Sequence, residues 1–181
     1  MKEIGWIGTG VMGAAMASRL LEAGYRLRVY NRTRAKAETL LARGARWADS
    51  PAEAVNGVDA AISIVGYPAD VEQTYLGSKG VLAAKQPPSI VVDMTTSSPD
   101  LARSIAAAAG ERGIRSIDAP VSGGDVGARN GTLSIMVGGD AGALEAMRPI
   151  FKNLGQRVTH LGGPGSGQHT KMVNQILIAS M

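Results

Sequence analysis

Residues 4–13 read IGWIGTGVMG and join a short apolar run to a glycine-rich turn. The apolar run at 4–7 predicts a buried strand, and the segment at 11–23 predicts a helix that ends before Gly24. Between them, the turn Gly8-Thr9-Gly10-Val11-Met12-Gly13 has the spacing GxGxxG. The first glycine permits a tight turn, the second lets the backbone approach a pyrophosphate, and the third lets helix and strand pack closely. In this strand–turn–helix context the pattern predicts a dinucleotide-binding loop, whereas an ordinary glycine turn is the alternative.

Short apolar runs and helical segments alternate beyond this loop. The runs predict strands at 27–30, 60–65, 90–93 and 114–118, and the segments between them predict helices at 33–43, 69–76 and 98–109. Such alternation favours an α/β fold of the Rossmann type, with a doubly wound, mostly parallel sheet. After Pro120 the pattern predicts strands at 133–137 and 158–161 and a helix at 141–151.

The end of the chain has a different character. A glycine-rich loop at 162–167 leads into an apolar, helical segment that runs from Gln168 to Met181 without a capping signal. We therefore expect a dinucleotide-binding domain at 1–164, with 165–181 as the start of an interdomain helix that continues into another domain outside this chain. The apolar end of this helix also predicts self-association.

Composition excludes several classes of protein. The 181 residues are 45% hydrophobic and 19% charged, which predicts one folded domain with a substantial core. Because there are no cysteines, disulfides, thiolate catalysis and cysteine-ligated zinc are excluded. The two histidines, His160 and His169, lack acidic neighbours at ligand spacing, so no metal site is expected. No run is long enough for a signal peptide or a membrane span, and we expect a cytoplasmic protein with no membrane partner.

The charge balance is basic, with a net charge of +4 and a sequence pI of about 9.6. The arginines are scattered along the chain, without a basic block and without interleaved aromatic residues. This distribution disfavours nucleic-acid binding and fits a polyanionic cofactor better.

The end of the second predicted strand bears on the choice of cofactor. NAD-specific sites usually place an acidic residue there, on the ribose hydroxyls, but this chain has Asn31, Arg32 and Thr33. The Arg32 guanidinium could pair with the 2′-phosphate of NADP, and no carboxylate is expected there to repel that phosphate. A solvated arginine at a helix start is the alternative. We predict that these three residues line the cofactor site, that NADP(H) is preferred, and that NAD(H) binding remains possible.

A second glycine turn follows a later predicted strand. Residues 118–124 read DAPVSGG, at the carboxyl end of the strand, where ligands bind in open α/β sheets. The Ser122 hydroxyl and the amides of Gly123 and Gly124 could form a concavity for an anion such as a substrate carboxylate. A plain glycine turn explains the local sequence equally well.

The last helix carries a polar stripe. Gln168, Lys171, Asn174 and Gln175 fall three and four residues apart, which places them on one face among apolar neighbours. A lone lysine on a helix is most often solvated, but on an otherwise buried helix this lysine is expected to point into a polar cavity. An ammonium there could polarise a substrate oxygen and exchange its proton, and partial burial would lower its pKa toward that task.

Four segments together resemble the β-hydroxyacid dehydrogenase family: GTGVMGAAMA at 8–17, DAPVSGG at 118–124, GARNGTLSIMVGG at 127–139 and GSGQHTKMVNQ at 165–175. The resemblance spans the whole chain. That family includes 3-hydroxyisobutyrate dehydrogenase, tartronate semialdehyde reductase, and glyoxylate and succinic semialdehyde reductases. It implies an oxidoreductase that transfers a hydride between NADP(H) and a small β-hydroxy acid, semialdehyde or 2-oxo acid.

The resemblance also implies roles for residues. Lys171 would be the general acid/base, and the substrate would be bound by Ser122, Gly123, Gly124, Asn174 and Gln175. The nicotinamide would be lined by Val65, Gly66 and Thr96. Many relatives have Asn where this chain has Gln175, and often a proline after the strand that ends near Gly66. The resemblance also implies a C-terminal helical domain, absent from this chain and reached through a long helix that begins around Lys171. It therefore implies a homo-oligomer for the full-length protein and poor turnover for this chain alone.

Three alternatives stay open. A relative of 6-phosphogluconate dehydrogenase would need further phosphate-binding residues. An imine reductase has a similar dinucleotide-binding half, but that group generally lacks the lysine at position 171. A non-catalytic NADP-binding module would keep the fold, and the intact Ser122 turn with Lys171 disfavours it.

Overall fold

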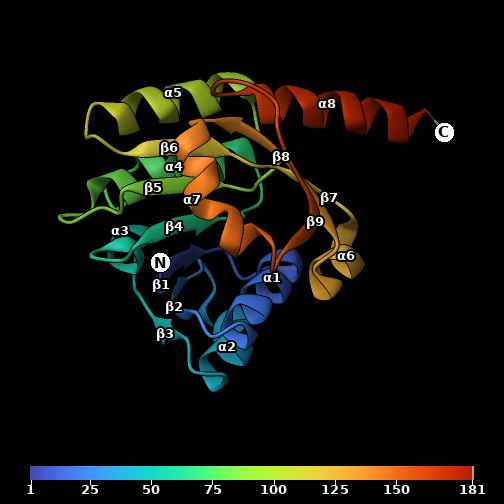
Figure 1. Cartoon of the computed structure of the whole chain (residues 1–181). Helices are drawn as coiled ribbons and strands as arrows, with labels where there is room; N and C mark the ends of the chain where they lie inside the picture. The colour runs from blue at the N-terminus through green and yellow to red at the C-terminus, as the bar shows by residue number, and fades with distance from the viewer. Residues whose placement is uncertain (181) are drawn as a thin grey trace.

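The computed structural model describes residues 1–180, in which strands and helices alternate along the chain (Figure 1). The strands are β1 (Glu3–Ile7), β2 (Arg26–Tyr30), β3 (Arg46–Trp47), β4 (Ala60–Ser63), β5 (Ile90–Asp93), β6 (Arg115–Asp118), β7 (Val121–Ser122), β8 (Leu133–Gly139) and β9 (Gly155–His160). The helices are α1 (Val11–Glu22), α2 (Glu38–Ala42), α3 (Pro51–Val55), α4 (Pro68–Leu76), α5 (Pro99–Gly110), α6 (Gly124–Asn130), α7 (Ala141–Phe151) and α8 (Ser166–Ala179). Two 3₁₀ turns, η1 (Arg34–Ala37) and η2 (Val81–Ala83), complete these elements.

The strands of the described chain form one sheet in the order β3-β2-β1-β4-β5-β6-β8-β7, and β9 pairs with β8. Neighbours from β3 to β6 are parallel, whereas β8 runs antiparallel to both β6 and β7. The strand order reverses between β1 and β4: β2 and β3 lie on one side of β1, and β4, β5 and β6 follow on the other side. Doubly wound folds have this arrangement. The predicted Rossmann-type, mostly parallel architecture is confirmed.

Strand β1 shows why both faces of this sheet are covered. Ile4 and Trp6 point into one buried cluster, and Ile7 points into a second cluster on the opposite face. The next parallel strands divide their side chains in the same way, so each is a continuous apolar run rather than an alternating one. The fully buried Trp6 also donates its indole N–H to the carbonyl of Gly8 at 2.8 Å, which ties the strand to the turn that follows it.

Several predicted boundaries are wrong for identifiable reasons. The helix predicted at 33–43 begins as the 3₁₀ turn η1, closed by the Lys36 amide on the Thr33 carbonyl at 3.1 Å, and only its second part is α-helical. The strand predicted at 158–161 starts earlier, at Gly155, because β9 pairs with β8 from Leu133 onward. Elements β3, α3, β7 and α6 were not expected, since two to seven residues are too few for periodicity to show.

Helix α8 corrects the expectation of an otherwise buried helix. It starts at Ser166, and its buried residues are Gly167, Gln168 and Lys171. The apolar side chains of its second half are exposed: Met172, Val173, Ile176, Leu177 and Ile178. Figure 1 shows this half, in red, projecting beyond the sheet. Gln168, Lys171 and Asn174 of the polar stripe therefore face the domain, whereas Gln175 and the apolar side chains do not. Met181, part of the predicted helix, lies outside the described residues.

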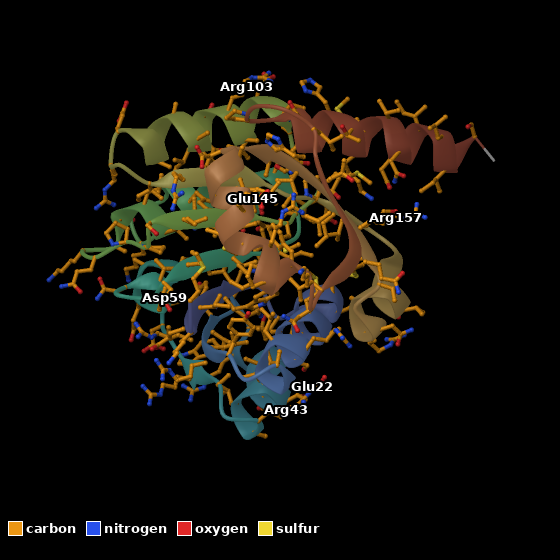
Figure 2. All side chains as sticks on the ribbon, in the orientation of Figure 1. Glu22, Arg43, Asp59, Arg103, Glu145 and Arg157 are labelled. Carbon is orange, nitrogen blue, oxygen red and sulfur yellow. The ribbon has the colours of Figure 1, made fainter. Side chains whose placement is uncertain are left out.

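The outer surface carries isolated ion pairs between exposed side chains. Arg43 pairs with Glu22 at 2.8 Å, and Arg148 pairs with Glu145 at 2.8 Å on α7 (Figure 2). Exposed pairs of this kind add little stability, so the two apolar clusters carry the fold. Within residues 1–180, no helix has the length and apolar character needed to span a bilayer.

Candidate active site

A cavity of about 850 Å³ lies at the carboxyl ends of β1, β2, β4 and β5. Parallel strands end at the same edge of a sheet, so the loops that follow them converge there. Most of the predicted cofactor residues line this cavity: Gly8, Gly10, Val11, Met12, Gly13, Asn31, Arg32, Thr33, Val65, Gly66 and Thr96, together with Gly124 of the second glycine turn. Thr9 is buried beneath the loop and is not part of the lining.

The three glycines of the first turn meet different surroundings. A Cβ at Gly8, where φ is +97°, would lie 2.0 Å from the Ile64 carbonyl oxygen, and one at Gly13 would lie 2.1 Å from the Gly8 carbonyl oxygen. By contrast, a Cβ at Gly10 would meet no atom within 4 Å, because this residue faces the cavity. Two glycines are therefore required by packing, and the third leaves a cradle open.

The open cradle suits an anionic group. The Thr9 amide donates to Asn31 Oδ1 at 2.9 Å, which fixes the turn against β2. Within the described chain, the amides of Gly10, Val11 and Met12 have no acceptor, and no side chain caps α1. Free amides at a helix N-terminus bind phosphate well, so these residues fit the pyrophosphate of a dinucleotide.

The part of the cavity next to Arg32 holds a carboxylate that the sequence did not lead us to expect. Arg32 lies 2.9 Å from Asp70 Oδ1, and its side chain is 83% exposed. Asp70 comes from the first turn of α4 and lines the same cavity. The expectation that no carboxylate lies near Arg32 is wrong, because only the end of β2 was considered and Asp70 follows 38 residues later.

Thr95, which sequence reasoning missed, and Gln168 are buried polar residues that tie together the loops after β4 and β5. The Val65 amide donates to Thr95 Oγ1 at 2.9 Å. Gln168 Nε2 donates to the Thr95 carbonyl at 2.7 Å, and Gln168 Oε1 accepts from the Ser97 amide at 2.8 Å. Gln168 was predicted as part of the stripe, but its role in joining α8 to the loop after β5 carries no signal in the sequence.

A buried carboxyl group lies below Thr95. Asp93 Oδ1 accepts hydrogen bonds from Ser63 Oγ at 2.9 Å and from the Thr95 amide at 3.1 Å. Burial raises the pKa of Asp93 from 3.8 to about 6, although these hydrogen bonds oppose the rise. Tyr75, whose hydroxyl lies 2.9 Å from Ser63 Oγ, is also buried, and desolvation raises its pKa.

The neighbouring carboxylate, Asp118, holds the start of α8. Its two oxygens accept from the Gly165 amide at 2.8 Å and the Gln168 amide at 2.9 Å. Gly167 packs so closely that an added Cβ would lie 2.5 Å from the Met136 carbonyl oxygen. The carboxyl end of β6 and the first turn of α8 are thereby held together, which fixes the position of Lys171 on the next turn of the helix.

Lys171 is only 7% exposed. Desolvation lowers the pKa of its ammonium group, and no neighbouring charge compensates among the residues that the structure describes. One turn further along, Asn174 Nδ2 lies 3.5 Å from Ser122 Oγ, so α8 runs beside the second glycine turn. Gln175 is exposed and lies 3.5 Å from Asn174 Nδ2.

The second glycine turn presents amides as well as the Ser122 hydroxyl. Gly123 and Gly124 have φ values of +132° and +62°, which side chains rarely adopt. Successive amides in such turns can converge on an anion. Only Gly124 of this group lines the large cavity; Ser122, Gly123, Lys171, Asn174 and Gln175 lie outside its lining.

Comparison with known proteins identifies the family. Residues 3–162 match the model described as the NAD binding domain of 6-phosphogluconate dehydrogenase. The chain is 51% identical over 179 residues to an uncharacterized oxidoreductase, YkwC, of Bacillus subtilis, covering 99% of this chain and 62% of that protein. It is 47% identical over 179 residues to the NAD-dependent L-serine dehydrogenase of Pseudomonas aeruginosa, covering 99% and 60%.

A solved structure of Mycobacterium tuberculosis 3-hydroxyisobutyrate dehydrogenase with L-serine is similar to this chain, with a TM-score of 0.92 and 35% identity, covering 99% of this chain and 60% of that one. The chain thus spans about 60% of the length of these proteins. Fold, matched model and relatives agree, and the chain belongs to the β-hydroxyacid dehydrogenase family as an NAD(P)-binding domain of the 6-phosphogluconate dehydrogenase type.

Proposed function

We propose that the protein transfers a hydride between NADP(H) and a small β-hydroxy acid or its carbonyl form, with Lys171 as the general acid/base. One observation carries the proposal: Lys171 is buried without a compensating charge, one helical turn from an amide that reaches Ser122. A buried cation without an ion-pair partner is costly for the fold, which supports a chemical role.

The cofactor would be held by groups that the cavity already presents. The amides of Gly10, Val11 and Met12 would bind the pyrophosphate, and Val65, Gly66 and Thr96 would line the nicotinamide, which supplies or accepts the hydride when bound. Asn31, Arg32 and Thr33 would contact the adenosine ribose, where the Arg32 guanidinium favours a 2′-phosphate. The L-serine dehydrogenase of P. aeruginosa is NAD-dependent, so dissociation constants measured with NADPH and with NADH, before and after Arg32→Ala, test this preference.

The substrate would be held by the second glycine turn and α8. Ser122 Oγ and the amides of Gly123 and Gly124 would bind the carboxylate, and Asn174 would orient it. In the reductive direction Lys171 would donate a proton to the carbonyl oxygen, and in the oxidative direction it would take that proton back. Desolvation lowers the pKa of the Lys171 ammonium group, which makes release of its proton easier than from a solvated lysine. Gln175, which is exposed, has the least support as a substrate contact.

Steady-state kinetics of the full-length protein test the role of the lysine. Lys171→Ala should lower kcat by about 10³-fold or more, within the range that a lost general acid/base produces together with lost positioning. The dissociation constant for NADPH should change by less than about threefold, since Lys171 lies outside the cavity lining. Lys152→Ala, at an exposed lysine after α7, is the control. Near-normal turnover of Lys171→Ala would remove the lysine from the mechanism.

A substrate panel separates the proposal from its rivals. Oxidation of L-serine and 3-hydroxyisobutyrate, and reduction of glyoxylate, succinic semialdehyde and tartronate semialdehyde, should each be assayed with both cofactors. Turnover of 6-phosphogluconate or of a cyclic imine, in place of these acids, would favour the other enzyme classes. Cofactor binding without turnover of any of them would favour a non-catalytic module.

We also propose that the full-length protein assembles with copies of itself. Support comes from the exposed apolar half of α8, where five large side chains face solvent. Sedimentation velocity of the full-length protein should find a species larger than a monomer. In the 181-residue chain, where Ile176 is exposed, Ile176→Lys should weaken self-association measured in the same way. A monomer at every concentration would contradict the proposal.

A further inference from the structure

We propose that Asp70 is a specificity-determining residue whose carboxylate competes with the adenosine 2′-phosphate for Arg32, and thereby narrows the preference for NADP(H) over NAD(H). The inference deepens the proposed function, because it rests on the cavity being the cofactor site. Its basis is the contact of 2.9 Å between Arg32 Nη1 and Asp70 Oδ1 at the adenosine end of the cavity.

The two partners are held very differently. The Arg32 side chain is 83% exposed, so it can move, whereas the Asp70 side chain is only 23% exposed. Asp70 Oδ2 also accepts from the Tyr67 amide at 3.0 Å, which fixes the carboxylate at the start of α4. At Gly66, an added Cβ would lie 2.8 Å from the same oxygen, so the glycine leaves room for the carboxylate. Asp70 is therefore a fixed anion and Arg32 its mobile partner.

The other charged groups at this end of the cavity do not replace Asp70. Asp49, which lines the cavity, accepts from the indole of Trp47 at 2.6 Å, and Arg34, which lies outside the lining, stacks over the same ring at 5.2 Å. Lys36 and Lys79 line the cavity, but neither forms an ion pair within residues 1–180. In that part of the chain, Asp70 is the carboxylate in contact with Arg32.

A fixed carboxylate has opposite effects on the two cofactors. A 2′-phosphate brought to Arg32 must share the guanidinium with the Asp70 carboxylate or displace that carboxylate from it. The 2′-hydroxyl of NAD(H) can instead donate to a carboxylate, as it does to the acidic residue at the end of the second strand in other dinucleotide sites. Arg32 thus favours NADP(H) and Asp70 favours NAD(H), although the two residues lie 38 positions apart in the sequence.

Asp70→Asn tests the inference, because it removes the charge and keeps an oxygen that can accept from the Tyr67 amide. Fluorescence titration of the protein with NADPH and with NADH should show the NADPH dissociation constant falling about tenfold while that of NADH stays the same or rises. Glu72→Gln is the matched control, since it removes an exposed carboxylate from the same helix outside the cavity lining. An unchanged ratio in Asp70→Asn, or an equal shift in Glu72→Gln, would overturn the inference.

A double variant separates this inference from the proposed cofactor preference. In an Arg32→Ala background, Asp70→Asn should change the NADPH constant by less than about threefold, because no guanidinium remains to be contested. A full tenfold change there would show simple charge repulsion and would overturn the competition for Arg32. If the unaltered protein binds both cofactors equally and Asp70→Asn then prefers NADPH, the proposed preference fails and the inference stands. If no variant binds either cofactor, both fail.

Discussion

Helices α1 and α8 both begin at a glycine-rich turn, and the difference between their first turns explains how this domain divides binding from structure. At α1, the amides after Gly10 have no acceptor among the described residues and face a cavity. At α8, the amides of Gly165 and Gln168 are bound by the carboxylate of Asp118. The N-terminus of α1 is open to an anion from solution, whereas the N-terminus of α8 already binds a carboxylate of the chain itself.

This comparison shows that a glycine-rich turn before a helix does not by itself make a ligand site. At the N-terminus of either helix, the first amides have no acceptor within the helix, and the helix dipole favours a negative charge there. What differs is whether a carboxylate of the same domain reaches them. At α8 the internal anion converts a possible binding site into an anchor, and the anchor positions Lys171, which is buried one turn later.

The largest effect is expected when α1 is made to resemble α8. Gly10→Asp would place a carboxylate at the open cradle, where it would repel the pyrophosphate. Because like charges held together cost several kcal/mol, the NADPH dissociation constant should rise about 1000-fold, equivalent to about 4 kcal/mol. Isothermal titration calorimetry would measure the change.

The fold should tolerate this substitution. Gly10 has φ −69° and ψ −171°, which other residues adopt, and an added Cβ meets no atom within 4 Å. Gly10→Ala is the control for size without charge, and it should weaken binding far less than Gly10→Asp. Equal effects of the two variants would mean that bulk, rather than charge, governs this helix end.

A second prediction concerns the carboxyl group beside the α8 anchor. Asp93 pairs in register with Asp118 on the adjacent strand, but burial raises its pKa to about 6. The folded protein therefore keeps the Asp93 proton up to about pH 6, whereas the unfolded chain releases it near 3.8. Between those values the folded state binds more protons, so this group makes stability fall as the pH rises.

Urea unfolding of the protein and of Asp93→Asn at several pH values would measure this effect. Relative to Asp93→Asn, which cannot ionise, the protein should lose about 3 kcal/mol between about pH 3 and pH 7, since each pKa unit corresponds to about 1.4 kcal/mol. Lost hydrogen bonds in the variant give a constant offset. A difference that does not vary with pH would show that Asp93 ionises normally in the fold.

The same contrast separates what sequence can predict from what it cannot. The α1 loop was predictable because its signal is local: a strand, three spaced glycines and a helix within twenty residues. The inward-facing side of α8 that carries Lys171 was predictable from spacing on one helix, but Lys171 does not line the cavity that was expected around it. The partners of α8 were not, because Asp118 and Thr95 reach it from 50 and 73 residues away. Such contacts exist only after the sheet has brought its strand ends together.

Burial along α8 was predicted only in part, for a related reason. The exposed apolar end of the helix was expected, but the helix around Lys171 was expected to be buried on its apolar side, and Met172 and Val173 there are exposed while the polar Gln168 is fully buried. A hydrophobic pattern shows that a face needs a partner, but it does not show whether this domain supplies one. At Gln168, two hydrogen bonds to backbone groups compensate for the burial of its amide.

The smallest of these effects is expected when the α8 anchor is loosened. Asp118→Asn removes the charge and one acceptor, so one buried amide of Gly165 or Gln168 loses its partner and the helix end loses its counter-charge. An unsatisfied buried amide and a lost helix–charge interaction together should cost about 2 kcal/mol of unfolding free energy. The NADPH dissociation constant should change by less than about threefold, because the α1 cradle is untouched, while turnover by the full-length protein should fall because Lys171 is misplaced.

Asp140→Asn is the matched control: Asp140 caps α7 through the Ala143 amide at the surface, and asparagine caps helices equally well. A loss of cofactor binding in Asp118→Asn as large as its loss of turnover would mean that the two helix ends are not independent, and the division between an open site and a closed anchor would no longer hold.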